Sequence, residues 1–274
     1  MKSVELPTGV RLPYVEAGDP SGVPVLLLHG VTDSWRSFEP VLPHLPESIH
    51  AVALTQRGHG DADRPASGYR TRDYAADVAA FADALGLGSF VIVGHSMGAT
   101  NAQRFAIDHP ERTRGLVLAA TFATYRSNPT VVELWESAIS RLTDPIDPAF
   151  VREFQQSTLA QPVPAAFLDT VVQESLKVPA RVWRASFEGF LEDDCTGEIG
   201  RIQAPTLILW GSRDALCPRG DQDVLRRTIQ SSRLVVYEDA GHALHWEAPQ
   251  RFAADLVAFA RHISPDAGGI EPAR

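Results

Sequence analysis

Three residues whose side chains could together perform nucleophilic catalysis each follow a short apolar run. Ser96 stands in the stretch Gly94-His95-Ser96-Met97-Gly98, and Asp214 and His242 follow two later runs in the same way. Serine is a weak nucleophile at neutral pH and needs a base that a third group orients. The residue types and their order along the chain therefore predict acyl transfer by Ser96, with His242 as base and Asp214 as its orienting acid.

The residues around Ser96 predict a sharp turn between a strand and a helix. The run from Phe90 to Val93 is β-branched and aromatic, and the stretch from Met97 to Ile107 has apolar positions at helical spacing. Gly94 and Gly98 are small enough to let the strand and the helix approach each other closely. Such a turn exposes the serine hydroxyl.

The elements needed to position these residues are short strands alternating with helices. Helical patterns run from Tyr74 to Leu85 and from Phe252 to His262. The alternation predicts an α/β fold with a mostly parallel, twisted sheet of about eight strands and helices on both faces. The expected strands are 4–6 and 10–16, which form a hairpin, then 24–28, 49–54, 90–93, 115–119, 206–210 and 234–237.

The interval from Phe122 to about Gly200 breaks this alternation. It contains helical patterns separated by prolines and no good strand candidate, and it is far longer than an ordinary crossover. We therefore predict a helical cap of residues 122–200 inserted into a core of residues 1–121 and 201–274. The cap is expected to cover the carboxyl ends of the strands, where open α/β sheets bind ligands.

An oxyanion site is expected beside Ser96. The run Leu26 to Leu28 ends in His29-Gly30-Val31, whose glycine lets the backbone approach the site. The backbone N–H groups of Val31 and Met97 are the candidate donors.

Five motifs carry a resemblance to a known family. VLLLHG, QRGHG, VGHSMGA, LILWGSRD and DAGHALHWEAP resemble, in this order, the α/β-hydrolase superfamily, specifically its small capped serine hydrolases of the esterase and lactonase kind. The resemblance implies the same triad and the same oxyanion donors. One departure is Ala62, which stands where many relatives have serine in the pattern R-G-x-G-x-S, so this loop is expected to be supported differently.

Three other acids are candidates for the role of Asp214, and His245 is a candidate metal ligand. Asp193 and Asp194 fit the spacing less well than Asp214, and Asp239 shares a loop with His242. His242 and His245 stand three residues apart like a metal pair, but a third ligand and the H-E-x-x-H pattern are missing. No metal is therefore expected.

Composition limits the partners. A net charge of −9 without a cluster of basic residues argues against nucleic acid. No apolar run approaches the roughly 20 residues that span a bilayer, and the first residues lack the apolar segment of a signal peptide. The expectations are a cytoplasmic protein without a membrane partner, and free thiols at Cys195 and Cys217.

Aromatic residues are expected to line an apolar pocket beneath the cap. The candidates after the oxyanion loop and in the cap are Trp35, Phe38, Trp135, Phe154, Phe167, Trp183, Phe187 and Phe190. Two or three of the eight should line the pocket, and Trp35, Trp135, Trp183 and Phe187 are chosen as substrate contacts.

The sequence thus predicts a serine hydrolase that cleaves a small, largely apolar ester or lactone with water and without a cofactor. Two further enzyme classes stay open, a carbon-carbon bond hydrolase with Arg181 or Arg184 as the cap cation, and a cofactor-free peroxidase. A small-molecule receptor that retains the triad is the alternative of another class. The preference for lactone or open-chain ester, the identity of the substrate and the oligomeric state do not follow from the sequence.

Overall fold

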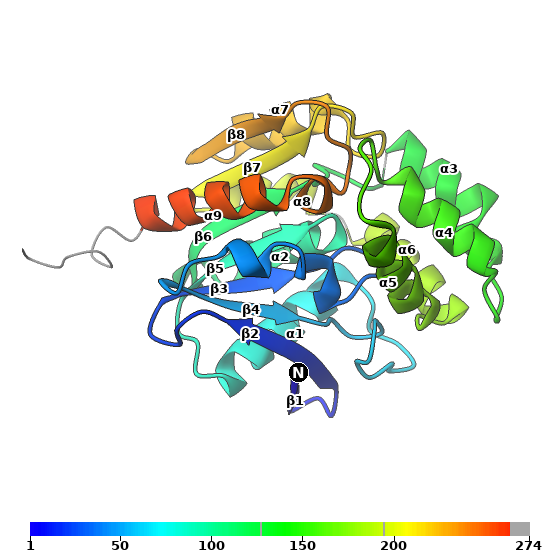
Figure 1. Cartoon of the computed structure of the whole chain (residues 1–274), viewed down its shortest axis with the longest axis horizontal. Helices are drawn as coiled ribbons and strands as arrows, with labels where there is room; N and C mark the ends of the chain where they lie inside the picture. The colour runs from blue at the N-terminus through cyan, green and yellow to red at the C-terminus, as the bar shows by residue number, and fades with distance from the viewer. Residues whose placement is uncertain (127, 194, 264–274) are drawn as a thin grey trace, which may run out of the picture.

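The computed structural model describes residues 1–126, 128–193 and 195–263. The sequence predicted a frayed tail from Pro265 to Arg274, which lies outside the described residues. The remainder forms a central sheet with helices on both faces and a group of helices at one edge (Figure 1).

The eight-stranded sheet has the order β1-β2-β4-β3-β5-β6-β7-β8. Strand β2 is antiparallel to both β1 and β4, and all other neighbours are parallel, so the prediction of a mostly parallel sheet is confirmed. The strands are β1 (Lys2–Glu5), β2 (Arg11–Ala17), β3 (Val23–Leu28), β4 (Ile49–Leu54), β5 (Phe90–His95), β6 (Thr113–Ala119), β7 (Thr206–Gly211) and β8 (Ser232–Tyr237).

The helices cover both faces of this sheet. The α-helices of the core are α1 (Thr71–Ala84), α2 (Met97–Asp108), α7 (Arg219–Thr228), α8 (Leu244–Glu247) and α9 (Pro249–Ile263). Short 3-10 helices are η1 (Trp35–Phe38), η2 (Leu42–His44), η3 (Pro110–Arg112), η4 (Ile139–Arg141) and η5 (Thr196–Arg201).

Alternation along the strands divides the core into two layers, because successive side chains of a strand point to opposite faces. In β3, Leu26 and Leu28 pack with α1, α2 and α7 on one face. Val25 and Leu27 pack with η1, η2 and α9 on the other. All four of these side chains are buried, as expected of a parallel strand that is covered on both sides.

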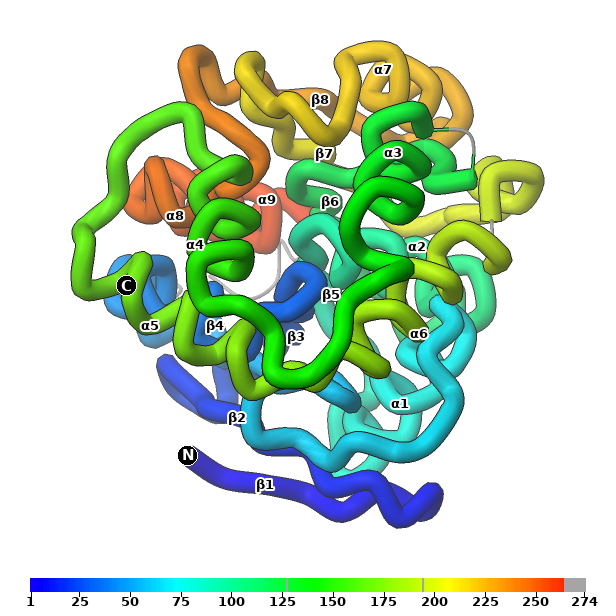
Figure 2. The backbone as a smooth tube through the Cα atoms, turned by 90° about the vertical axis from the view of Figure 1, so that its right-hand side faces the viewer, coloured from blue at the N-terminus to red at the C-terminus, as the bar shows by residue number. Residues whose placement is uncertain are grey.

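The long interval between β6 and β7 forms a helical cap. It contains α3 (Pro129–Ser137), α4 (Pro148–Ser157), α5 (Ala165–Leu176) and α6 (Ala180–Glu192). Figure 2 looks onto these helices and shows them across the carboxyl ends of the strands. The division into a cap of residues 122–200 and a core of the rest stays a prediction.

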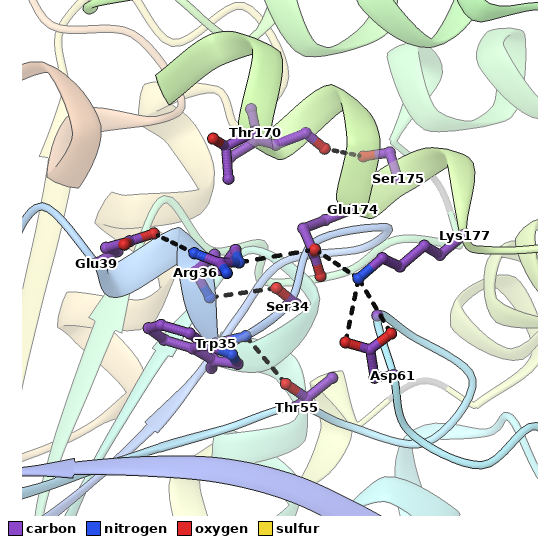
Figure 3. A network of polar contacts seen from close by, with 12 residues as sticks. Ser34, Trp35, Arg36, Glu39, Thr55, Asp61, Thr170, Glu174, Ser175 and Lys177 are labelled. Carbon is purple, nitrogen blue, oxygen red and sulfur yellow. Dashed lines mark hydrogen bonds and ion pairs between the residues drawn. The ribbon is translucent and has the colours of Figure 1, made fainter. Parts of the chain in front are cut away.

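A network of charged side chains ties α5 of the cap to the core (Figure 3). The Lys177 ammonium lies 3.0 Å from Asp61 of the β4–α1 loop and 2.8 Å from Glu174. The Glu174 carboxylate is buried and lies 3.7 Å from the guanidinium of Arg36 in η1. These contacts hold α5 against the segment that follows β3 and against the β4–α1 loop.

Among the described residues, no helix combines the length and the apolar character that crossing a membrane requires.

Candidate active site

Ser96 occupies a strained turn between β5 and α2. Its φ of 52° and ψ of −117° lie outside the regions that residues other than glycine normally adopt. The turn is held by a hydrogen bond from the Ser96 N–H to the carbonyl of Ala119 at 3.0 Å. A Cβ on Gly98 would come within 2.2 Å of the Leu28 carbonyl oxygen, so a larger residue cannot stand there without moving the strand.

Asp214 and His242 meet at the ends of β7 and β8. The Oδ2 atom of Asp214 lies 3.0 Å from Nδ1 of His242, and both side chains are buried. The other carboxylate oxygen accepts the backbone N–H groups of Leu216 and Cys217, both at 2.9 Å. Burial raises the pKa of Asp214, but the His242 charge and these hydrogen bonds outweigh it and hold the pKa below its ordinary value. Asp214 therefore stays ionised.

Ser96 and His242 line the same pocket. The described residues include no hydrogen bond between the Ser96 hydroxyl and the His242 ring. In enzymes without a bound substrate such bonds are often long and shorten in the complex. The structure thus brings Asp214 to His242, and it places Ser96 on the pocket that His242 also faces.

Two further histidines lie behind His242, because His95 packs against His242 and His245 packs against His95. His95 contacts the His242 carbonyl oxygen through Nε2 at 3.1 Å, and the His95 and His245 rings lie 4.3 Å apart between centroids. Burial lowers the pKa of His95 to about 3 and that of His245 well below its usual value. Both rings are neutral at pH 7 and support the position of His242 without competing with it for a proton.

The segment after β3 approaches Ser96 through Gly30 and Val31, which both line the pocket. A Cβ on Gly30 would stand 2.9 Å from Nδ1 of His95, which explains why this position needs glycine. No backbone hydrogen bond of the described residues uses the N–H of Val31 or of Met97. Both donors are available to a ligand oxygen.

The pocket beneath the cap has about 580 Å³ of empty space, part of it open to solvent, and its lining is mainly apolar. Three of the eight aromatic candidates line it, namely Phe154, Phe187 and Phe190. Of the four chosen substrate contacts, Phe187 is on the wall, whereas Trp35, Trp135 and Trp183 are not among the lining residues.

These three tryptophans have packing roles. Trp183 is completely buried between Phe150 and Phe154, with its ring 5.0 Å from that of Phe154. Trp135 packs at the edge of the same apolar cluster. Trp35 packs against the face that carries α9, with the Arg36 guanidinium 4.9 Å above its ring. Helical spacing therefore does not tell whether an aromatic residue packs in the core or lines a pocket.

Two of the other candidate acids for the Asp214 role have different partners. Asp193 lies 2.7 Å from the Arg72 guanidinium, and Asp239 is exposed and lies 2.6 Å from that of Arg213. Asp194 lies outside the described residues.

The cap arginines also point elsewhere. Arg181 donates to the carbonyl oxygens of Pro65 and Arg64, and Arg184 donates to that of Leu142. Neither is among the residues that line the pocket.

A group of potential metal ligands coincides with the candidate triad. Ligand atoms of Asp214, Cys217 and His242 all lie within 4.8 Å of one another. However, Asp214 and His242 already bond to each other, and burial raises the pKa of the Cys217 thiol well above its usual value, so the thiol stays protonated. This donor set does not favour a metal, and the absence of a metal stays a prediction. Cys195 and Cys217 are both buried, and neither forms a disulfide.

Four polar residues of the pocket wall were missed by the sequence analysis, namely Asp33, Tyr125, Gln155 and Thr158. Asp33 stands three residues after Gly30, and that position was the one available signal. Tyr125 is buried, and burial raises the pKa of its phenol, although the neighbouring Thr100 and Ser96 side chains lower it. The phenol therefore stays protonated and can donate a hydrogen bond next to Ser96. Gln155 comes from cap helix α4, whose register against the core is not legible from the sequence.

Comparison with known proteins identifies the family. Residues 23–249 match the family model described as alpha/beta hydrolase fold, so the chain belongs to this family. It is 28% identical to the pimeloyl-[acyl-carrier protein] methyl ester esterase of Neisseria meningitidis over 84% of this chain and 90% of that one. A shorter match, 39% identical, covers 38% of this chain and 37% of the 2-(acetamidomethylene)succinate hydrolase of Mesorhizobium japonicum.

The fold is also similar to that of a thermophilic esterase from Thermogutta terrifontis. The two structures superpose with a TM-score of 0.83 at 26% identity, and the match covers 96% of this chain and 99% of the esterase. The family and these relatives support a hydrolase activity.

Proposed function

We propose that the protein is a serine hydrolase that cleaves a carboxylic ester or lactone of a small, largely apolar substrate through an acyl-enzyme on Ser96. The observation that carries the proposal is the contact between Asp214 and His242, because His242 lies on the wall of the pocket that Ser96 also lines. The mainly apolar lining supports a substrate that is itself largely apolar.

In this mechanism the substrate carbonyl lies beside Ser96. The Ser96 hydroxyl oxygen attacks the carbonyl carbon, and Nε2 of His242 takes the hydroxyl proton. Asp214 holds the opposite ring nitrogen as N–H and stabilises the imidazolium that forms. The N–H groups of Val31 and Met97 bind the oxyanion, a contribution worth about 3 kcal/mol per donor.

The intermediate collapses when its carbon–oxygen bond to the leaving alcohol breaks. His242 donates its proton to that alcohol, which leaves an acyl ester on Ser96. A water molecule then gives its proton to His242 and attacks the ester, and a second collapse returns the proton to Ser96 and releases the acid. No cofactor enters this scheme.

The test is replacement of the nucleophile. In Ser96→Ala the turnover of a panel of chromogenic esters and lactones should fall by roughly three to six orders of magnitude, by analogy with triad deletions in other serine hydrolases. Ser21→Ala removes a hydroxyl from an exposed loop and is the matched control. A fluorophosphonate should add covalently to the wild type and not to Ser96→Ala, as mass spectrometry of the intact protein would show.

Equal turnover by wild type and Ser96→Ala would refute the mechanism. A receptor would instead bind these esters without turning them over in either form. Carbon-carbon bond cleavage gains no support from Arg181 and Arg184, because both bond to backbone carbonyls and neither lines the pocket.

A further inference from the structure

The pocket wall holds a carboxyl group that the proposed mechanism does not use. Asp33 is 3% exposed and lies on the segment that carries Val31. One of its oxygens accepts a hydrogen bond from the Ser37 hydroxyl and the other accepts one from the Gln155 amide, both at 3.1 Å. Within the part of the chain that the structure describes, Asp33 forms no salt bridge. A buried acid without one destabilises the fold, so its place on the pocket wall indicates a role in binding.

The amide nitrogen of Gln155 is occupied by hydrogen bonds within the protein, whereas its amide oxygen is left for a ligand. Its Nε2 atom lies 3.1 Å from Oγ1 of Thr32, 3.1 Å from Oδ1 of Asp33 and 2.7 Å from Oγ of Ser175. These contacts use the two protons that the amide can donate. The described residues place no hydrogen bond on Oε1 of Gln155.

The two side chains therefore form an acceptor pair, which we define as the Asp33 carboxylate together with Oε1 of Gln155. The rest of the lining is mainly apolar, and among the described residues no lysine or arginine contributes to it. A substrate carboxylate would meet the Asp33 charge there without a compensating cation. A hydroxyl or amino group would satisfy the acceptors.

We propose that the acceptor pair of Asp33 and Gln155 binds a hydrogen-bond donor of the substrate, so that the enzyme selects esters whose acyl chain carries a hydroxyl or amino group over plain and carboxylated esters. This inference rests on the proposed function, because it concerns the same pocket. A site built to hydrogen-bond a substrate group discriminates strongly against analogues that lack it, since its own polar atoms are then left unpaired.

The protonation of Asp33 is consistent with this role. Burial raises the pKa of Asp33, and the charge of Glu174 adds to this effect. Hydrogen bonds from Ser37 and Gln155 and the charge of His242 lower the pKa, and the net value is about 7. An amino group would bind as ammonium and stabilise the ionised carboxylate. A hydroxyl would bind to the ionised form as a neutral donor.

The experiment compares methyl esters of equal chain length at pH 8. The rate of hydrolysis is measured by titrating the acid that is released. The first set is methyl hexanoate, methyl 6-hydroxyhexanoate, methyl 6-aminohexanoate and monomethyl adipate. The second set is methyl butanoate, methyl 3-hydroxybutanoate and monomethyl succinate. We expect kcat/KM to be about 10- to 100-fold higher for a hydroxyl or amino ester than for the plain ester of the same length, although the donor makes the substrate less apolar.

The variant Asp33→Asn should reduce this ratio at least tenfold, and Asp83→Asn, which changes an exposed aspartate, should leave it unchanged. Preference for the amino ester over the hydroxyl ester would identify an ammonium ligand, and the reverse would identify a neutral one. No preference for any donor-bearing ester at either length, or a preference that persists in Asp33→Asn, would overturn the proposal.

Binding separates this inference from the proposed function. Calorimetric titration of the same esters into Ser96→Ala measures their affinities whether or not the wild type turns them over. If wild type hydrolyses none of the esters, tighter binding of the donor-bearing esters to Ser96→Ala still supports the acceptor pair. Equal binding of all esters overturns it.

Discussion

Asp214 and Asp33 are buried carboxyl groups, and the charge of His242 lowers the pKa of both. The net pKa shifts nevertheless have opposite directions. Asp214 receives two backbone N–H groups and the imidazole, and its pKa falls. Asp33 receives one hydroxyl and one amide, and burial raises its pKa to about 7. Burial alone thus does not decide the charge of an acid, because the number and kind of donors decide whether the anion is stabilised.

The difference fits the different tasks proposed for the two acids. An acid that orients a catalytic histidine must stay charged through every step, and Asp214 meets this condition. An acid that gains or loses its charge near neutral pH is suited to respond to what binds beside it, which is the role proposed for Asp33. Three experiments can break or sharpen this contrast.

The largest effect is expected from replacing each acid by its amide. Asp214→Asn should lower kcat for a plain ester by about 10³- to 10⁴-fold, because the amide can hold His242 in the wrong tautomer. Asp33→Asn should lower kcat for the same ester by less than about 10-fold, since no step of the mechanism uses this group. Steady-state kinetics with methyl hexanoate measures both. Losses of equal size would contradict the division of tasks.

The second effect concerns stability against pH. The pKa of Asp33 rises from 3.8 to about 7 on folding, so between these values the folded state holds a proton that the unfolded state has lost. This contribution to the free energy of unfolding therefore falls as pH rises through the interval and stays lost above it.

Asp33→Asn removes that dependence. Relative to wild type, the free energy of unfolding of the variant should rise by about 2 to 3 kcal/mol between pH 5 and pH 8, at about 1.4 kcal/mol per pH unit. Urea denaturation at the two pH values measures it, with Asp83→Asn as control. An unchanged difference would show that Asp33 is ionised at both pH values.

The smallest effect is expected at Gln155. Gln155→Met keeps the length of the side chain but removes the amide that donates to Asp33, so the ionised carboxylate loses a donor. The variant should be about 1 to 2 kcal/mol less stable than wild type at pH 8, and less affected at pH 5, where Asp33 is protonated. Gln156→Met changes the exposed neighbour on the same helix and should be neutral at both pH values. A loss independent of pH would argue against a link between Gln155 and the Asp33 charge.

The sequence was informative wherever a residue is placed by the backbone of the sheet. Ser96, Asp214 and His242 each follow a strand, and the carboxyl ends of parallel strands meet at one edge, so the strand order is enough to bring them together. The mostly parallel sheet and the helical insertion followed from the alternation of apolar runs and helical patterns. Their ends differ from the prediction by up to about three residues in the strands and helices of the core, as expected of boundaries.

The residues of the pocket wall were harder to predict from the sequence, because they depend on how the helices pack against one another. Trp183 and Phe187 are four residues apart on α6 and so share a face, yet Trp183 is enclosed by Phe150 and Phe154 while Phe187 reaches the pocket. Periodicity identifies the face of a helix but not the level at which the cavity opens. The role of Gln155 could not be predicted for the same reason, since its contacts with Thr32 and Asp33 join residues more than 100 positions apart.

The insertion point of the cap has a consequence for how such a protein can diversify. The chain leaves the sheet after β6 and returns in β7, its paired neighbour, so both ends of the inserted segment are held at a fixed separation by the sheet itself. Lengthening a loop between fixed ends costs little, about 0.6 kcal/mol for each doubling. Evolution or an engineer could exchange the whole insertion for another of different size and acquire a new selectivity, while the strands that fix the reacting groups stay as they are.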